Sequence, residues 1–143
     1  MKITLTRCYR LAASHRLYSP KLSEAENRRV YGKCCNPHGH GHNYVVEVTL
    51  TGPVDPVTGM VANLGELDPF VEREVIGAFD HKNLNEEVGE FQACVPTTEN
   101  LLRVIYRRLE KFPAAHLERV RIEETSNNSF ELSREETQAR QAK

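Results

Sequence analysis

The chain has 143 residues, of which 39% are hydrophobic and 27% are charged, and its formal net charge is −1. These values are ordinary for a soluble globular protein, and the length suits one domain with a real core. The near-neutral charge excludes the basic footprint of a nucleic-acid or membrane-surface binder, and no stretch reaches the roughly 20 apolar residues of a membrane helix. Residues 1–10 lack the apolar run of a secretory signal. We therefore expect a cytoplasmic protein with reduced cysteines.

The first part of the sequence predicts strands separated by a charged segment and a turn. Residues 3–13 alternate as a half-buried strand does, and the charged stretch 20–31 is typical of a loop or short helix. Residues 43–52, NYVVEVTLTG, are rich in β-branched side chains and predict a second strand. The prolines and glycine of 53–61 indicate a turn, after which we expect a short strand near 60–64 and thus an antiparallel hairpin.

The second part predicts two helices and a closing pair of strands. Residues 66–79 carry apolar side chains at helical spacing, with Pro69 placed in the first turn. A second helix follows PTT, with Thr97 or Thr98 as its cap. Its apolar face consists of Leu101, Leu102, Ile105, Leu109 and Phe112. Residues 118–125 and 128–132 predict the strand pair. This order indicates an α+β fold, an antiparallel sheet with helices on one face.

Three histidines give the strongest chemical signal. His40 and His42 are two residues apart at the start of a strand, so their side chains point to the same side. His15, at the end of the first strand, offers a third imidazole. Three histidines with an open fourth position are typical of a catalytic zinc site, although the stretch HGHGH also fits a solvated loop. His38 has the same spacing from His40, but it lies further from the strand.

Cysteines in the same stretch allow two other interpretations. Cys34, Cys35, His40 and His42 could close a structural zinc site, but adjacent cysteines lack the two-residue spacer of a zinc knuckle. Alternatively, Cys34 near a metal and a histidine could act as a thiolate base or nucleophile. We expect Cys8 and Cys94 to be small core side chains.

Acidic residues near the ends of elements are further candidates. Asp80 and His81 are adjacent, and an acid beside an imidazole supports proton transfer, although on their own they fit a helix-end turn and a surface histidine. Glu124 ends an apolar strand, where a carboxylate is either solvated or receives paired N–H donors of a ligand. Glu99 fits the first turn of a helix. We expect His116 to lie on the surface.

Six segments in order carry a resemblance over residues 7–132. They are ASHRL, GKC-x-NP-x-GHGHNY, DP-x-TGMV-x-NL, DHKNLN, TTEN and ET-x-NN. With these segments the chain resembles the 6-pyruvoyltetrahydropterin synthase family, of the tunnelling fold. The resemblance implies a four-stranded antiparallel sheet with two helices packed on one face, a single catalytic domain over 1–132 and a polar tail over 133–143.

The resemblance also implies roles for individual residues. His15, His40 and His42 match the Zn²⁺ ligands. Cys34, Asp80 and His81 match the catalytic triad. Glu124 matches the pterin-anchoring carboxylate, and Thr98 and Glu99 match the segment that lines the pterin pocket. Cations close to these segments could hold a triphosphate, namely Arg16, Lys21, Arg28 and Lys33.

The implied reaction converts 7,8-dihydroneopterin triphosphate to 6-pyruvoyltetrahydropterin and triphosphate, a lyase step of tetrahydrobiopterin biosynthesis without an external redox cofactor. The implied assembly is a homohexamer of two trimers, with sites between subunits. Cys35 and His38 depart from the family pattern, and Cys34 with His38 and His40 also fits the queuosine-pathway branch. The alternative is therefore a 6-carboxytetrahydropterin synthase that releases acetaldehyde. A non-catalytic zinc module and a purely structural subunit are two further alternatives.

Overall fold

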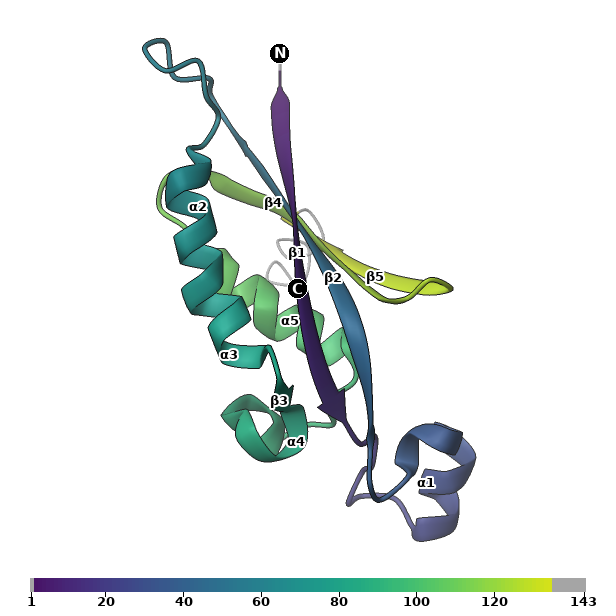
Figure 1. The fold of residues 1–143 in the computed structure, drawn as a ribbon. Coiled ribbons are helices and arrows are strands. Elements are labelled where there is room, and N and C mark those ends of the chain that lie inside the picture. The colour runs from purple at the N-terminus through teal and green to yellow at the C-terminus, as the bar shows by residue number, and fades with distance from the viewer. Residues whose placement is uncertain (1, 135–143) are drawn as a thin grey trace.

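The structure, a computed structural model, describes residues 2–134 and contains a five-stranded sheet in the order β3-β1-β2-β4-β5 (Figure 1). The strands are β1 (Ile3–His15), β2 (His40–Gly52), β3 (Lys82–Asn83), β4 (His116–Thr125) and β5 (Asn128–Ser133). The pairs β1–β2, β2–β4 and β4–β5 are antiparallel, whereas β3 runs parallel to β1. Ser133 thus belongs to a strand, and residues 135–143 of the expected tail lie outside the described part.

Helices follow β1, β2 and β3. They are α1 (Glu24–Tyr31), the 3₁₀ helix η1 (Gly32–Cys35), α2 (Leu64–Val71), the π-helix η2 (Glu72–Ile76), α3 (Gly77–Phe79), α4 (Leu84–Glu87), the 3₁₀ helix η3 (Gly89–Gln92) and α5 (Thr98–Leu109). Ser23 and Glu26 form a capping box at the start of α1, and Thr97 caps α5 by accepting from the Asn100 N–H. None of the described helices is long and apolar enough to span a membrane.

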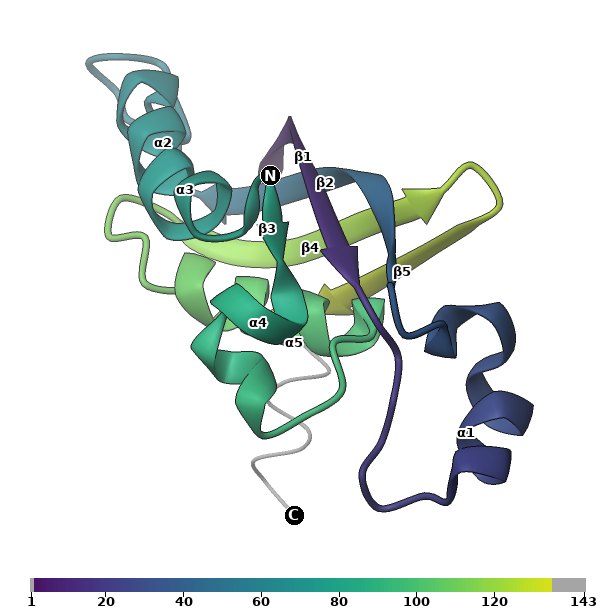
Figure 2. The same cartoon turned by 60° about the horizontal axis from the view of Figure 1, so that its bottom comes forward.

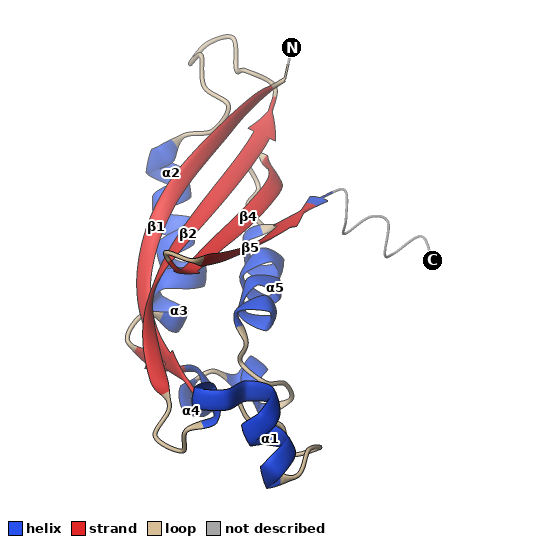
Figure 3. Cartoon of the chain, turned by 90° about the vertical axis from the view of Figure 1, so that its right-hand side faces the viewer, coloured by secondary structure: helices blue, strands red, loops and turns tan. Residues whose placement is uncertain are grey.

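The predicted α+β class is confirmed, but the sheet has five strands and not four. The additional strand, β3, pairs only Lys82 and Asn83 with Ala13 and Ser14 of β1. Two residues carry no periodic pattern, so this strand has no signal in the sequence. Figure 3 shows α2, α3 and α5 on the same side of the sheet. Figure 2 shows α1 beyond the paired ends of β1 and β2, apart from these three helices.

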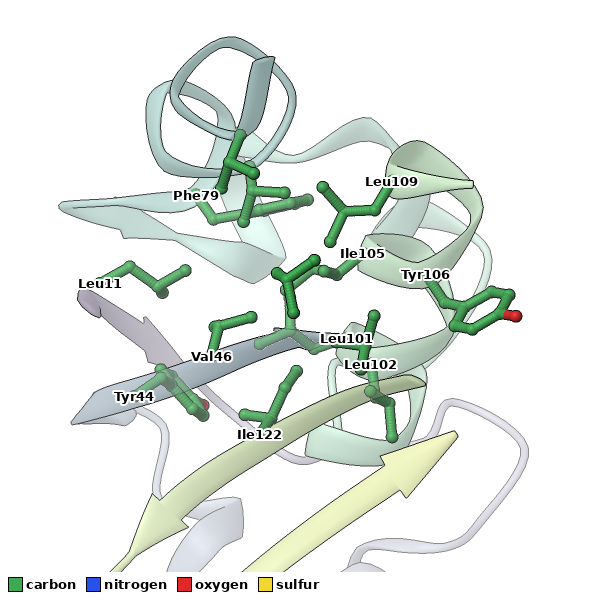
Figure 4. Packing of buried hydrophobic residues seen from close by; sticks show 14 of the residues in the cluster. Leu11, Tyr44, Val46, Phe79, Leu101, Leu102, Ile105, Tyr106, Leu109 and Ile122 are labelled. Atoms are coloured by element: carbon green, nitrogen blue, oxygen red, sulfur yellow. The ribbon is translucent and has the colours of Figure 1, made fainter. Parts of the chain in front are cut away.

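The core lies between that face of the sheet and the helices. Along β1 the buried residues alternate, as the period of a strand requires, and Leu11 and Ala13 face inward. In Figure 4, Val46 and Ile122 on the strands point toward Ile105 of α5, and all three are fully buried. The apolar stripe predicted on α5 therefore forms one wall of the core.

The predicted hairpin after β2 is wrong. Residues 53–63 form a loop with no strand, in which the Asp55 carboxylate accepts the Val57 and Thr58 N–H groups. These side-chain hydrogen bonds, together with backbone bonds from Asp55 to Met60 and from Gly59 to Asp55, hold a closed turn and not a returning strand. Asn63 then caps α2, which starts at Leu64, so Pro69 lies inside the helix and not in its first turn.

The helix from Leu64 to Phe79 contains one π turn, η2, which joins α2 to α3. A π turn holds one residue more than an α turn, so it rotates the following residues around the helix axis. Phe79 at its end is fully buried, and Asp80 leaves the helix in an extended conformation.

The expected burial of Cys8 and Cys94 is also wrong, because both are exposed. Tyr9 and Leu11 of β1 face the core, and successive side chains of a strand point to opposite faces, so Cys8 lies on the outer face of β1. Cys94 follows η3, where its thiol donates to the Glu90 carbonyl. His116 is exposed, as expected.

Candidate metal centre and active site

Three histidines meet at the ends of the two longest strands. His15 is the last residue of β1 and pairs directly with His40, the first residue of β2. The Nε2 atoms of these two residues are 3.1 Å apart. His42 follows two residues later on the same face, and one ring nitrogen of each histidine lies within 4.8 Å of the others. The convergence predicted from the spacing is confirmed.

The protonation of His15 and His42 suits a metal ion. The Nδ1–H of His15 donates to the Pro96 carbonyl over 2.7 Å, which leaves the Nε2 lone pair facing His40 and His42. Burial lowers the pKa of His15 and of His42, so both favour the neutral form that ligates metals. Within the described part of the chain, Nε2 of His42 is buried without a hydrogen-bond partner. The donor set therefore fits a divalent cation that prefers imidazole nitrogen.

Glycine in the HGHGH stretch is required by close packing. Gly39 has a φ of +70°, and a Cβ atom there would lie 2.8 Å from the His15 carbonyl oxygen. His38 is exposed, and its backbone N–H donates to the Asn36 side chain. His38 is not part of the metal-ligand cluster found among the described residues, and neither is any cysteine.

Glu124 lies beside this cluster on β4. Its Oε1 atom is 3.2 Å from His42 Nε2, outside hydrogen-bond alignment, and its Oε2 atom accepts from the Asn128 side chain at 2.7 Å. Its side chain is 15% exposed, so the carboxylate keeps access to solvent at the edge of the histidine cluster. A half-buried carboxylate of this kind is placed to receive N–H donors from a bound molecule.

Two buried hydroxyl groups line the same region. Thr98, the first residue of α5, is 3% exposed, and Tyr44 is 1% exposed. Neither hydroxyl has a fully aligned hydrogen-bond partner among the described residues. Burial and the nearby Glu124 charge raise the pKa of Tyr44, so it is a neutral phenol. Tyr44 was not predicted from the sequence, although alternation from His40 and His42 places it on the same face.

Cys34 lies in η1, near Glu124. Burial and the negative charge of Glu124 raise the pKa of its thiol, so within a single metal-free chain the thiol is protonated at neutral pH. The neighbouring Cys35 is 8% exposed and is thus the less accessible of the pair. Glu99 lies exposed in the first turn of α5.

Asp80 and His81 are held on the edge of the sheet. The Asp80 carboxylate accepts the Ala12 N–H at 2.8 Å, and the His81 N–H donates to the Ala12 carbonyl. His81 has a φ of 56°, and its side chain is 84% exposed. Its Nε2 atom is 3.7 Å from the Asp80 carboxylate. Among the described residues, no hydrogen bond or ion pair links either side chain to Cys34, so one chain does not assemble the predicted triad.

Known proteins show where this arrangement belongs. A family model described as 6-pyruvoyl tetrahydropterin synthase matches residues 4–135. The chain belongs to this family. A 6-pyruvoyl tetrahydrobiopterin synthase of Poecilia reticulata is 50% identical over 125 residues, which cover 87% of this chain and 85% of the relative.

Structural and more distant relatives agree with membership in the synthase family. The structure of Caenorhabditis elegans 6-pyruvoyl tetrahydropterin synthase superposes with a TM-score of 0.88 at 41% identity, covering 93% of this chain and 96% of the other. A putative 6-carboxy-5,6,7,8-tetrahydropterin synthase of Archaeoglobus fulgidus is 38% identical over 117 residues, which are 81% of this chain and 92% of the relative. The resemblance to the tunnelling fold is thus confirmed.

Proposed function

We propose that this chain is a zinc-dependent 6-pyruvoyltetrahydropterin synthase, a lyase acting on 7,8-dihydroneopterin triphosphate. The observation that carries the proposal is the cluster of His15, His40 and His42 with Glu124 and Cys34 at its margin. Three imidazole ligands leave a coordination position open, as catalytic zinc sites do. Zn²⁺ bound there would polarise the hydroxyl groups of the substrate side chain and acidify the neighbouring C–H bonds.

The protein's own groups bind the ring and move protons. The Glu124 carboxylate accepts hydrogen bonds from the amino and ring N–H groups of the pterin and so holds the ring while its side chain reacts. Thr98 and Glu99 flank the same region at the start of α5. Cys34 acts as the base that takes a proton from the substrate side chain.

Assembly would supply the partners that Cys34 lacks. The pKa of the Cys34 thiol is raised within one chain, so it needs a basic neighbour. We assign that task to Asp80 and His81 of the partner subunit, because the exposed His81 side chain beside Asp80 on the sheet edge suits a contact between chains. An active site between subunits follows from this assignment.

The sheet edges support a homohexamer made of two trimers. β3 covers only Ala13 and Ser14 of β1, so from Ile3 to Leu11 the outer edge of β1 has no strand partner among the described residues. The outer edge of β5 is equally open within residues 2–134. Open edges pair readily with other strands, and pairing between copies would cover both. Multi-angle light scattering should give six chains per particle.

The second candidate is a 6-carboxytetrahydropterin synthase acting on the same substrate. The archaeal relative named for that product covers most of the chain, and Cys34 has the matching spacing to His38. The exposure of His38, away from the histidine cluster, favours the first candidate. A cytoplasmic location stays a prediction for either enzyme.

The test is product analysis by mass spectrometry with 7,8-dihydroneopterin triphosphate, on the zinc-loaded protein and on protein treated with a chelator. We expect 6-pyruvoyltetrahydropterin that requires the metal and disappears in Cys34→Ala. Matched variants Cys35→Ala and His38→Ala should retain it. A 6-carboxy product with acetaldehyde would select the second candidate. A protein that binds zinc but turns over no substrate would contradict both.

A further inference from the structure

The turn that carries Cys34 is attached to the residues after β1 by two hydrogen bonds. The Leu17 N–H donates to the Cys34 carbonyl at 2.8 Å. Nε of Arg16 donates to the Cys35 carbonyl at 2.9 Å. η1 has only four residues and no side-chain cap at its start. The Gly32 N–H joins it to α1 by donating to the Arg28 carbonyl, and the two bonds above join it to the end of β1. Of the two, only the bond from Arg16 comes from a side chain.

Arg16 is itself held on three sides. Its guanidinium group lies 4.4 Å from the centre of the Tyr18 ring. Its backbone N–H donates to Oδ1 of Asn85 at 2.7 Å, and its carbonyl accepts from Nδ2 of Asn85 at 2.9 Å. The backbone is therefore anchored to α4, and the side chain has one preferred direction, toward the Cys35 carbonyl.

We propose that Arg16 is a positioning residue for the Cys34 thiol. The inference rests on the proposed function, since it concerns the base of that reaction. A planar guanidinium places its Nε donor and stacks on an aromatic ring at the same time, which a lysine ammonium does not reproduce. Displacement of a reacting group by about 1 Å lowers the rate up to roughly a hundredfold. The hydrogen bond from Arg16 to the Cys35 carbonyl therefore acts on the chemical step.

The competing role for Arg16 is a direct contact to the substrate triphosphate. The two roles predict different kinetics. Loss of a ground-state contact to phosphate raises KM, whereas displacement of the base lowers kcat at an unchanged KM. A positioning role for Arg16 also predicts a change that can be measured without substrate. When the hydrogen bond to the Cys35 carbonyl is lost, η1 loosens and the half-buried Cys34 becomes more exposed to alkylating reagents.

The experiment compares Arg16→Lys with the wild type as zinc-loaded, assembled protein. The measurements are kcat and KM for 7,8-dihydroneopterin triphosphate, zinc content, and the rate of Cys34 alkylation by iodoacetamide, resolved by mass spectrometry. We expect kcat to fall about 10- to 100-fold and KM to change less than threefold. Alkylation of Cys34 should become severalfold faster at full zinc content.

Arg73→Lys is the matched control. Arg73 also stacks on an aromatic ring, with its guanidinium 5.3 Å from the centre of the Phe70 ring. Its Nε also donates a hydrogen bond, but to the Glu74 side chain and not to η1. Its replacement should change neither kcat nor the alkylation rate. If Arg16→Lys does not fold, Tyr18→Leu removes the stacking partner, together with an exposed hydrogen bond from the Tyr18 hydroxyl to Glu24, and should lower kcat about three- to tenfold.

An unchanged kcat and alkylation rate would overturn the proposal. So would a raised KM with unchanged kcat, which would make Arg16 a phosphate contact. If the wild type itself turns over no substrate, the proposed function fails, while the alkylation rates still decide whether Arg16 holds Cys34 in place.

Discussion

Replacement of Asn27 should destabilise the protein far more than its place in a charged helix suggests. Asn27 is fully buried in α1. Its Oδ1 accepts the Ser19 N–H at 2.8 Å, and its Nδ2 donates to the carbonyls of Ser19, Leu22 and Ser23. The side chain thus organises the segment between His15 and α1, which includes Arg16 and Tyr18.

The size of the effect follows from the groups that lose their partners. In Asn27→Ala the carbonyl of Ser19 keeps the Leu22 N–H, and that of Ser23 keeps the residue 27 N–H. The Ser19 N–H and the Leu22 carbonyl lose their hydrogen bonds to the amide. An orphaned buried group costs about 1–3 kcal/mol, and Ser19 and Leu22 are partly exposed, so each of the two groups should cost about 1–2 kcal/mol. The free energy of unfolding should then fall by about 2–4 kcal/mol. That is a large share of the roughly 5–15 kcal/mol typical of a domain.

Urea unfolding of the metal-free protein measures this change. Asn36→Ala is the control, because among residues 2–134 the exposed Asn36 side chain accepts only the His38 N–H, and its loss should cost less than about 1 kcal/mol. Asn27→Asp should cost at least as much as Asn27→Ala, since it turns an oxygen toward three carbonyls. A loss below about 1 kcal/mol for Asn27→Ala, or one no larger than the control, would show that the buried amide does not organise this segment.

Three further predictions concern the metal cluster and the sheet edge. Zinc at a thousandfold its dissociation constant should stabilise the protein by about 4 kcal/mol and raise Tm by roughly 8–16 °C in calorimetry; a His40→Ala variant should show no such rise. The pKa values of His15 and His42 are lowered in the folded state. As the pH falls, these two histidines are therefore protonated at a higher pH in the unfolded state than in the folded state. Stability of the metal-free protein is then complete above the ordinary histidine pKa of about 6.5 and should fall as pH drops below it, which urea midpoints between pH 7.5 and 5 would measure. Asp80→Asn keeps an acceptor for the Ala12 N–H, so we expect a wild-type Tm with activity lost at least tenfold. Asp80→Ala removes the acceptor and should lower both Tm and activity. Equal Tm values for the two variants would contradict a structural role for the hydrogen bond between Asp80 and Ala12.

The parts of the fold that the sequence predicts well are those with a sustained period. The alternation in β1 and β2 and the apolar stripe of α5 each extend over ten or more residues, so few other structures fit them. β3 is too short for any period. The loop 53–63 misleads because a turn signal between apolar residues fits a hairpin and a capped helix equally well.

The candidate site divides in the same way. His15, His40 and His42 follow from strand alternation, because residues two apart share a face. The link from His15 to Pro96 does not, since it joins residues far apart through a backbone carbonyl that any residue supplies. Asn27 was missed for a similar reason, as a buried amide inside a charged helix looks like a surface residue until its partners are known.

The π turn η2 affects how this chain is compared with its relatives. It lies between Pro69 and Asp80, and it absorbs one residue more than an uninterrupted α-helix would hold. In an uninterrupted α-helix of the same length in residues, Asp80 would be rotated by about 100° around the helix axis. A relative with one residue deleted in this stretch would form an α-helix without the π turn and still direct its acidic side chain toward β1. A gap between residues 72 and 76 in an alignment would therefore mark the loss of the π turn, with the aspartate–histidine pair kept at the same edge of the sheet.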